Sequence, residues 1–278
     1  MNTTLEAQCP HCLGKLELET KPKWNIETSP KMKPLSLVTV TTAQPRAEAF
    51  LSHMRDLSDD IGAEFVVGYD TLYGIGGMEM AQKYADMMCI VKSKGYLESV
   101  LQDVIDAAGG IWILRLDDDE MVTPAMWKWL KDKEYESGKS QIWSFPEATL
   151  FPSTMSFISS TPFWPDIHPR LQTWRYAQWD RNPHGGAKHG PGVTAPVAIA
   201  HHKLLVKTIG ERRAIWEQRD KGKARDEIHA SMSVPEDNYD ELTIHPLSDG
   251  YFPDAHLVRG KGRTIHLTPR ANNDTIGE

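Results

Sequence analysis

Residues 35–116 alternate between short apolar runs and segments whose apolar residues recur every three or four positions. The β-branched, apolar runs are typical of buried strands, which we expect at 35–41, 63–69, 89–91 and 111–116. The helical spacing predicts three intervening helices, at 46–57, 78–88 and 96–108. This alternation indicates an α/β fold with a doubly wound, mostly parallel sheet and helices on both faces. Ligands bind such sheets beyond the carboxyl ends of the strands.

Beyond residue 140 the pattern becomes irregular and rich in Trp, Pro and His. Residues 163–170 do not resemble sheet core, so we expect an irregular C-terminal region of loops and short strands over the open end of the sheet. A strand at 195–200, ending at His201, and a polar helix at 209–223 are predicted within it. The expected parts are an N-terminal extension at 1–33, a main domain at 34–225, divided into halves at 34–130 and 131–225, and a loop-rich extension at 226–278.

The chain has 278 residues, of which 40% are hydrophobic and 25% charged, as in an ordinary soluble globular protein. Its 38 acidic residues outnumber the 31 basic ones, which argues against a surface built throughout to hold a polyanion. No apolar run approaches the roughly 18 residues of a membrane span, and the N-terminus lacks a secretion signal pattern. Three cysteines are too few for a disulfide framework, so we expect a cytoplasmic protein, in the host cytoplasm if the chain is viral.

Four acidic residues, 117–120, directly follow the predicted strand at 111–116. An Asp-x-Asp pair at the end of a buried strand is costly to desolvate unless a cation or hydrogen-bond donors compensate its charge. Mg²⁺ and Mn²⁺ bind carboxylate oxygens together with substrate phosphates, so Asp117 and Asp119 are candidate ligands of a nucleotide–metal site. The alternative is a solvated helix N-cap, in which Asp119 or Glu120 precedes a helix that starts near Pro124.

Short motifs between residues 35 and 225 occur in a characteristic order and spacing. They are residues 35–42 with Pro45-Arg46, residues 63–70, Trp112-Ile-Leu-Arg-Leu-Asp-Asp-Asp-Glu120, Trp164-Pro-Asp-Ile-His-Pro-Arg170-Leu171, and His201 with Thr208, Glu211 and Arg212. The first three resemble the nucleotide-sugar half of a family-two-type glycosyltransferase with the GT-A fold, as found in bacteria and phages. The last two are similar to the Pro-Asp-x-x-x-Arg-Leu and His-…-Ser-x-x-Glu-Arg segments of bacterial members.

The resemblance implies a nucleotide half at 34–130, an acceptor half at 131–225 and a role for each matched position. Asp119, with Asp117, would hold a divalent cation, Mn²⁺ or Mg²⁺, and His201 would be a further ligand from the far side of the crevice. The residues implied to bind the nucleotide sugar are Thr41, Thr42 and Arg46 along the nucleotide, Asp70 beside the base, Asp117 at the ribose or metal, Asp118 next to it, and Arg212 at the phosphates. Lys94 is added to them because it lies near the crevice edge.

An inverting transferase also needs a carboxylate or a His to take the proton of the acceptor hydroxyl. Asp166 is the first candidate, since it lies in a predicted loop with Trp164 and His168, where an aromatic platform for a sugar or base is expected. The other candidates by residue type are Asp180, His184 and Glu147. Alternatively, Pro165-Asp166 forms an ordinary turn, and a retaining enzyme has no such base.

Three further features each have two interpretations. Cys9-Pro-His-Cys12 has the form of half a zinc ribbon, and it either binds Zn²⁺ with ligands from elsewhere or is a degenerate remnant. The glycine-rich residues 184–192 form either a mobile lid over the donor or a surface loop. The Arg and Lys residues at 259–270 either contact an anion, which is an acceptor such as DNA or the phosphates of the donor, or belong to a solvated tail.

These observations predict a hexosyl- or pentosyltransferase that moves a sugar from a nucleoside-diphosphate donor, a UDP-sugar in our interpretation, to a hydroxyl acceptor. The acceptor is either a glycan, such as a bacterial surface polysaccharide, or a hydroxylated DNA base, as in phage-type DNA modification. Two alternatives stay open: a metal-dependent nucleotidyltransferase that uses the same crevice, and a non-catalytic nucleotide or nucleic-acid binding module.

Overall fold

The chain divides into two compact units, Met1–Met32 and Lys33–Glu278. The computed structural model describes residues 4–8, 15–19, 33–44, 47–138, 140–182, 186–190, 192–219, 232–237, 242–247, 258–259 and 265–266. In the first unit, β1 (Thr4–Gln8) and β2 (Lys15–Glu19) pair as antiparallel strands. Among the described helices of the chain, none combines the length and the apolar character that a membrane crossing requires.

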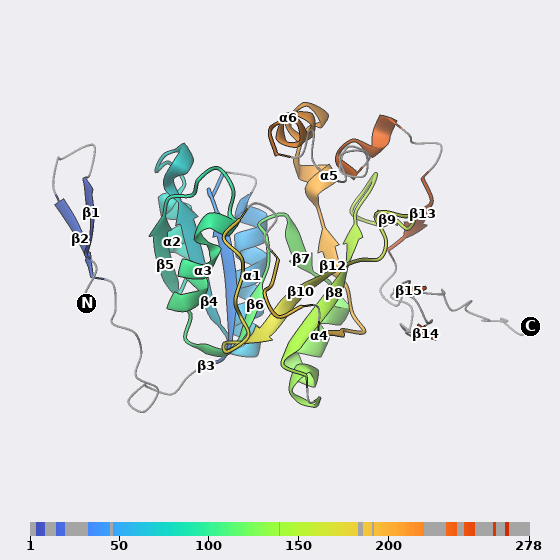
Figure 1. Cartoon of the computed structure of the whole chain (residues 1–278), viewed down its shortest axis with the longest axis horizontal. Helices are drawn as coiled ribbons and strands as arrows, with labels where there is room; N and C mark the ends of the chain where they lie inside the picture. Colours follow the sequence, from blue (N-terminus) through green and yellow to red (C-terminus); the bar gives the residue numbers. More distant parts are fainter. Residues whose placement is uncertain are drawn as a thin grey trace, which may run out of the picture. The chain divides into compact units, whose positions relative to one another are not determined.

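A nine-stranded sheet forms the centre of the second unit (Figure 1). Its strands are β3 (Lys33–Thr41), β4 (Glu64–Asp70), β5 (Met87–Val91), β6 (Gly110–Arg115), β7 (Glu120–Val122), β8 (Ile142–Thr149), β10 (Asp166–Thr173), β11 (Val193–Thr194) and β12 (Ile199–His201). The order is β5-β4-β3-β6-β10-β8-β12-β7, with β11 beside β8. The neighbours β5, β4, β3 and β6 are parallel, whereas β10 is antiparallel to β6 and β8, and β7 is antiparallel to β12. The expected α/β class is confirmed, with a parallel first half and a mixed second half.

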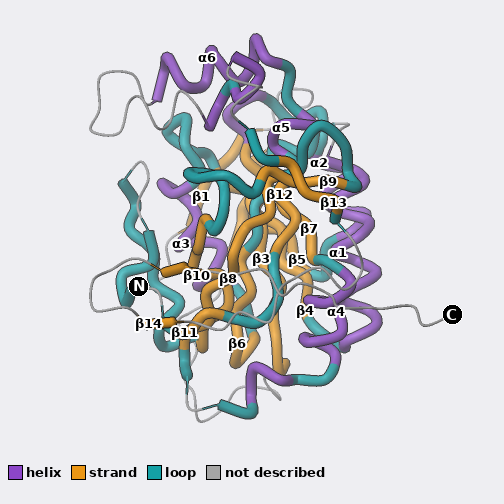
Figure 2. Tube along the Cα trace, turned by 90° about the vertical axis from the view of Figure 1, so that its right-hand side faces the viewer, coloured by secondary structure: helices purple, strands orange, loops and turns teal. Residues whose placement is uncertain are grey.

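Helices cover both faces of the sheet because successive side chains of a buried strand point to opposite faces. On one face, α1 (Glu48–Ile61), α2 (Met78–Tyr84) and α4 (Pro124–Lys131) share a core with strand residues such as Leu37 and Phe65. On the other face, α3 (Glu98–Ala107) packs on Val38 and Val66. Figure 2 shows these helices on either side of the strands. A Cβ at Gly68 of β4 would lie only 2.6 Å from Cγ2 of Val104, so glycine permits the close approach of α3.

Shorter elements complete the described part of the second unit. They are η2 (Thr71–Tyr73), η3 (Glu134–Glu136), α5 (Lys203–Val206), α6 (Ile209–Arg219), the pair β9 (Ser156–Ile158) and β13 (Ile244–Pro246), and the pair β14 (Val258–Arg259) and β15 (Ile265–His266). The predicted helix at 209–223 begins where α6 begins, and its last four residues lie outside the described part. The strand expected at 195–200 is β12, which starts later, at Ile199.

The expectation that residues 163–170 lie outside the sheet core is wrong. They run into β10, a central strand that pairs with β6 through Leu171↔Leu114 and with β8 through Asp166↔Glu147. The side chains from Arg170 to Thr173 are buried. The sequence of β10 has no apolar run that marks it as a strand, because polar residues alternate along it and the charge of the buried Arg170 is compensated by Glu120 and Glu147 on other strands.

The strand ends that carry the predicted site residues meet at one edge of the sheet. Thr41 at the end of β3 is level with Tyr69 of β4, and Asp70 is level with Val91 at the end of β5. From the mixed half, the pair Asp166↔Glu147 reaches the same edge, because β10 runs antiparallel to β6 and its first residues lie beyond the end of β6. The last residue of β12, His201, pairs with Glu120 of β7, directly after the acidic turn.

Candidate active site

The acidic residues 117–120 form a tight turn between β6 and β7. The backbone N–H of Glu120 donates to the carbonyl oxygen of Asp117 at 3.0 Å. The alternative that these residues cap a helix is wrong, since α4 begins after Thr123, whose hydroxyl oxygen accepts from the backbone N–H of Met126 at 3.2 Å. The turn therefore points its carboxylates at the sheet edge.

Asp118 and Thr41 join the acidic turn to the end of β3. The Thr41 hydroxyl donates to Oδ2 of Asp118 at 2.7 Å and accepts from the backbone N–H of Ala43 at 2.9 Å. Burial and the negative charge of Asp119 raise the pKa of Asp118 to about 6, although the hydrogen bond from Thr41 acts in the opposite direction. The two residues predicted beside the nucleotide thus contact each other.

Asp119 and His201 approach each other from the two halves of the sheet. Oδ1 of Asp119 lies 3.6 Å from Nε2 of His201, and Oδ2 of Asp119 forms an ion pair with Nζ of Lys207. The Asp119 carbonyl also accepts from the backbone N–H of His202 at 2.7 Å, which ties β12 to the turn. Burial opposes ionisation of Asp119, but its hydrogen bond to His201 and the charge of Lys207 lower its pKa well below the ordinary value. Asp119 is therefore a buried carboxylate.

Asp117, the other predicted cation ligand, faces different partners. It pairs with Nη2 of Arg115 through Oδ1, and its Oδ2 lies 3.8 Å from Nη2 of Arg170. Burial raises the pKa of Asp117, while the charge of Arg115 lowers it in part. The structure thus brings Asp119 and His201 together but places the Asp117 carboxylate between two arginines.

A buried ion network lies beneath these residues and connects three strands. Arg170 of β10 donates to Glu120 of β7, with Nε 3.0 Å from Oε2, and to Oε1 of Glu147 on β8 at 2.6 Å. Burial opposes the charge of Glu120, yet Arg170 and Arg115 lower its pKa below the ordinary value. Burial and the charge of Glu120 raise the pKa of Glu147 well above its ordinary value. One guanidinium thus serves two carboxyl groups.

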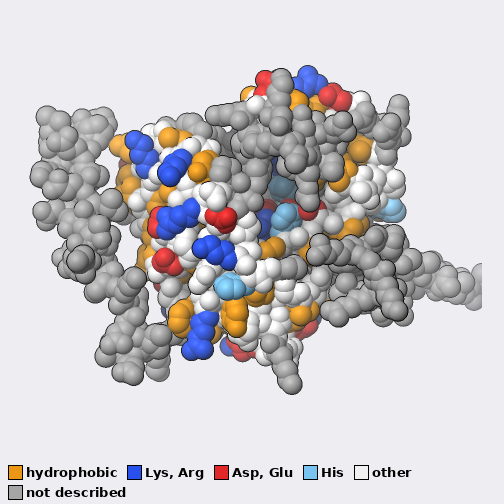
Figure 3. Space-filling view, in the orientation of Figure 1, with side chains coloured by type: hydrophobic (Ala, Val, Ile, Leu, Met, Phe, Trp, Pro, Cys, Tyr) orange, Lys and Arg blue, Asp and Glu red, His pale blue; other side chains and the backbone are white. Residues whose placement is uncertain are grey.

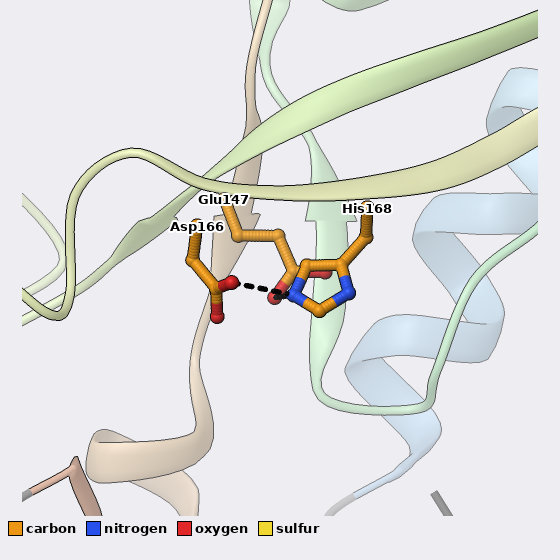
Figure 4. A group of neighbouring side chains, drawn as sticks. All are labelled: Glu147, Asp166 and His168. Carbon is orange, nitrogen blue, oxygen red and sulfur yellow. Dashed lines mark ion pairs between the residues drawn. The ribbon is translucent and has the colours of Figure 1, made fainter. Parts of the chain in front are cut away.

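Glu147, Asp166 and His168 form a group on the mixed half of the sheet edge (Figure 4). Each residue offers one possible ligand atom, and these three atoms lie within 4.8 Å of one another. Among the described residues, this is the group of three whose spacing could hold a metal ion. Nε2 of His168 lies 2.9 Å from Oδ1 of Asp166 and 3.9 Å from Oε2 of Glu147. Burial opposes the ionisation of Asp166, but the hydrogen bond and charge of His168 lower its pKa.

Glu147 connects the two predicted parts of the site. Its Oε2 lies 3.4 Å from Nδ1 of His201, whose other ring nitrogen faces Asp119. Burial disfavours protonation of His201, but the hydrogen bond and charge of Asp119 raise its pKa. A continuous series of polar contacts therefore runs from Asp119 through His201 and Glu147 to His168 and Asp166. Figure 3 shows His, acidic and basic side chains together near the centre of this face.

Other predicted residues lie around this centre with contacts of their own. Asp70 is buried, and its Oδ1 accepts from the backbone N–H groups of Leu72 and Ser93, both at 3.0 Å, which holds the loops after β4 and β5. Thr42 is half-buried after β3, and Lys94 is exposed, with its backbone N–H bonded to the Ser99 hydroxyl at 3.0 Å. Asp180 accepts from the Asn182 side chain at 2.9 Å.

Arg212, expected at the phosphates, is buried in a different set of contacts. Its guanidinium pairs with both carboxylate oxygens of Glu236 and donates to the carbonyl oxygens of Ser233, at 2.7 Å, and Lys207, at 3.2 Å. A phosphate contact would require these bonds to break, so the arrangement gives Arg212 a structural role. Arg46, His184, Cys9 and Cys12 lie outside the described residues.

Sequence reasoning missed Lys207 altogether and considered Glu147 only by residue type. Lys207 lies between His201 and the start of α6, and its contact with Asp119, 88 residues away, has no local signal in the sequence. The role of Glu147 depends on the register of β8 against β10 and β12, which no local pattern encodes.

No family model matches the sequence, and no curated protein matches it. A structure of TarS 1–349 from S. aureus in complex with UDP-GlcNAc is 11% identical over 72% of this chain and 70% of that one, with a TM-score of 0.43. The mannosyltransferase PcManGT from Pyrobaculum calidifontis, in complex with GDP-Man and Mn²⁺, is 13% identical over 73% of this chain and 70% of that one, with a TM-score of 0.44. Likeness this low leaves the reaction to be argued from the side chains of the site.

Proposed function

We propose that the chain is a metal-dependent glycosyltransferase that moves a hexosyl or pentosyl group from a nucleoside-diphosphate donor, a UDP-sugar, to the hydroxyl of an acceptor. The acceptor is a glycan or a hydroxylated DNA base. The observation that supports this most is the meeting, at one sheet edge, of Asp119 from the acidic turn with His201, Glu147, His168 and Asp166 from the mixed half.

On the donor side, the proposal places the nucleotide along the ends of β3 and β4, beside Thr41 and Asp70. Asp119 and His201 fit a divalent cation, since a carboxylate and an imidazole are donors that Mn²⁺ accepts and Oδ1 and Nε2 are only 3.6 Å apart. The cation, Mn²⁺ or Mg²⁺, supplies positive charge that stabilises the diphosphate as it leaves. Asp117, the other expected ligand, stays paired with Arg115 in this arrangement.

On the acceptor side, Asp166 is the proposed general base. Its side chain is 34% exposed and its lowered pKa keeps it ionised at neutral pH, so it can accept the proton of a hydroxyl that approaches from solvent. His168, at 2.9 Å, holds the carboxylate in position. In this role Asp180 and His184 are second candidates.

The proposal is tested by thermal denaturation with a panel of UDP-, GDP- and CDP-sugars, each with and without Mn²⁺. A specific donor at 100 times its Kd stabilises the folded protein by about 2.7 kcal/mol, which corresponds to a rise of roughly 5–10 °C in Tm. We expect this rise with a UDP-sugar only when Mn²⁺ is present. Asp119→Asn abolishes it, whereas the control Asp132→Asn, at the exposed end of α4, retains it.

Product analysis separates the alternatives. Release of UDP on transfer or slow hydrolysis supports the transferase. Release of pyrophosphate from a nucleoside triphosphate identifies a nucleotidyltransferase, and nucleotide binding that Asp119→Asn leaves unchanged, without turnover, identifies a non-catalytic module. If no donor shifts the Tm in the presence of Mn²⁺, the proposed function is wrong.

A further inference from the structure

Lys207 brings a cation into the buried part of the site. It follows α5 directly, and its side chain is only 18% exposed. Its Nζ pairs with Oδ2 of Asp119, whose side chain is 9% exposed. A hydrogen bond also holds the backbone of Lys207, because its carbonyl oxygen accepts from Nε of the buried Arg212 at 3.2 Å.

A contribution to folding stability is a poor explanation for the buried ion pair between Lys207 and Asp119. Desolvating an ammonium and a carboxylate costs about as much as their attraction returns, so a buried pair of this kind contributes little to folding. Lys207, Asp118 and Asp119 instead line a small pocket with Ala47 and Val206. Ala47 precedes α1, in the segment that follows β3, so the ammonium lies on the donor side of the sheet edge.

The ion pair with Lys207 also occupies the Asp119 carboxylate, which the proposed function assigns to the divalent cation as a ligand. The ammonium of Lys207 pairs with Oδ2 of Asp119, and a divalent ion between Oδ1 of Asp119 and Nε2 of His201 would lie beside it on the same carboxylate, so the two cations repel each other. Once the ion is bound, the ammonium must find another anion. The ammonium sits on a flexible four-carbon stem, and a phosphate oxygen is a natural partner for it.

We infer that Lys207 is a ligand of the donor diphosphate, which Asp119 holds in place until a divalent cation takes over that carboxylate. This inference rests on the proposed function and assigns one more residue to it. It has two consequences. The cation alone binds weakly because it must displace the ammonium, and cation and nucleotide strengthen each other's binding because the nucleotide receives the displaced charge.

The test is calorimetric titration of the full chain with Mn²⁺, with and without saturating UDP. It compares the wild type with Lys207→Met, Lys207→Gln and the control Lys83→Met, an exposed lysine that pairs with Glu48. Without UDP, both Lys207 variants bind Mn²⁺ about tenfold more tightly than the wild type, within the roughly 5- to 150-fold range of coupling between two ligands. With UDP this advantage disappears, and UDP binds the variants more weakly. Asp119→Asn loses Mn²⁺ binding in every case.

Unchanged or weaker Mn²⁺ affinity in both Lys207 variants overturns the inference, and the proposed function then still stands if the wild type transfers sugar. Tighter Mn²⁺ binding and weaker UDP binding in the variants, together with a wild type that binds UDP but transfers no sugar, support the inference and refute the proposed function. If neither the wild type nor the variants bind Mn²⁺, the inference fails, and so does the metal dependence. Far-UV circular dichroism of each variant confirms that it is folded.

Discussion

His201 lies between two acidic side chains, and each of its ring nitrogens faces one of them. Nε2 faces Asp119 at 3.6 Å, and Nδ1 faces Glu147 at 3.4 Å. A histidine that binds a metal through one nitrogen commonly donates its other N–H to a carboxyl group, which fixes the orientation of the ring. Glu147 is thus suited to position His201, and Arg170 holds Glu147 in turn.

At the residue scale, Asp166→Asn tests the general base. We expect kcat to fall by about 100- to 10,000-fold because the amide cannot accept a proton, while the Kd for the nucleotide stays unchanged. Steady-state kinetics and a nucleotide titration measure the two effects. The control is Asp180→Asn, which we expect to keep most of the activity. A large loss in the control with little loss in Asp166→Asn would transfer the role to Asp180.

The pH dependence of the same reaction tests the contact between His168 and Asp166. His168 lowers the pKa of Asp166, so in the wild type the base stays ionised to acidic pH and activity falls only below the ordinary pKa of an aspartate. His168→Gln removes this effect and raises the pKa of Asp166. The acid side of the kcat profile then moves to higher pH. A profile that stays in place would show that Asp166 does not limit the rate.

Cys89 offers a test away from the site. Burial raises the pKa of its thiol to about 11. The thiolate is the nucleophile, so at pH 8 only roughly 10⁻³ of Cys89 is reactive. We expect iodoacetamide to label Cys89 about a hundredfold more slowly in the native protein than in the protein unfolded with urea, as followed by peptide mass spectrometry. Equal rates would show that the thiol is accessible and its pKa ordinary.

At this scale the sequence predicted residue types better than their partners. The meeting of Asp119 with His201 followed from the resemblance and from a strand that ends in acidic residues. The contacts of Arg212 with Glu236 and of Lys207 with Asp119 join positions 24 and 88 residues apart. Such pairings depend on how whole elements pack, so the resemblance, which assigned Arg212 to the phosphates, did not reveal its contact with Glu236.

At the scale of elements, the strands β7, β8 and β10 are joined by a buried ion network in addition to the apolar core that they share. Arg170→Leu leaves Glu120 and Glu147 without their shared partner, and breaking a buried ion network of this kind costs about 3–5 kcal/mol. The control is Arg181→Leu, which removes an exposed pair with Asp103 and costs at most about 1 kcal/mol. Urea denaturation measures both free energies of unfolding. Equal losses would contradict the structural importance of the network.

The charged residues of the mixed half also explain why the sequence predicted the strands of the parallel half better than those of the mixed half. The parallel half follows the hydrophobic pattern, since β3, β4 and β6 are apolar and buried between helices on both faces. In the mixed half, β8 and β10 carry Glu147, His168 and Arg170 into the sheet, and these residues are typical of loops when read alone. A polar strand is stable here because its charges find partners on adjacent strands, and those partners come from distant parts of the chain.

At the scale of the whole molecule, the site depends on the joining of the two halves of one sheet. The antiparallel pairing of β6 with β10 brings the acidic turn after β6 level with the start of β10. Neither half alone contains both the Asp119 carboxylate and the groups of the mixed half. We therefore expect the second unit to unfold as one cooperative body, with loss of nucleotide binding in the same transition.

The division into Met1–Met32 and Lys33–Glu278 leads to a prediction for a chain that begins at residue 33. β3 starts at Lys33, and its partners are β4 and β6, both in the second unit, so the shortened chain retains every described pairing of the nine-stranded sheet. We expect its Tm and its stabilisation by UDP with Mn²⁺ to match those of the full chain.

Zinc content, measured on both proteins by mass spectrometry of the metals, tests Cys9 and Cys12 separately. If the shortened chain transfers sugar to a small alcohol but not to the complete glycan or DNA acceptor, the first unit recognises the acceptor. If the shortened chain fails to fold, the two units are not independent.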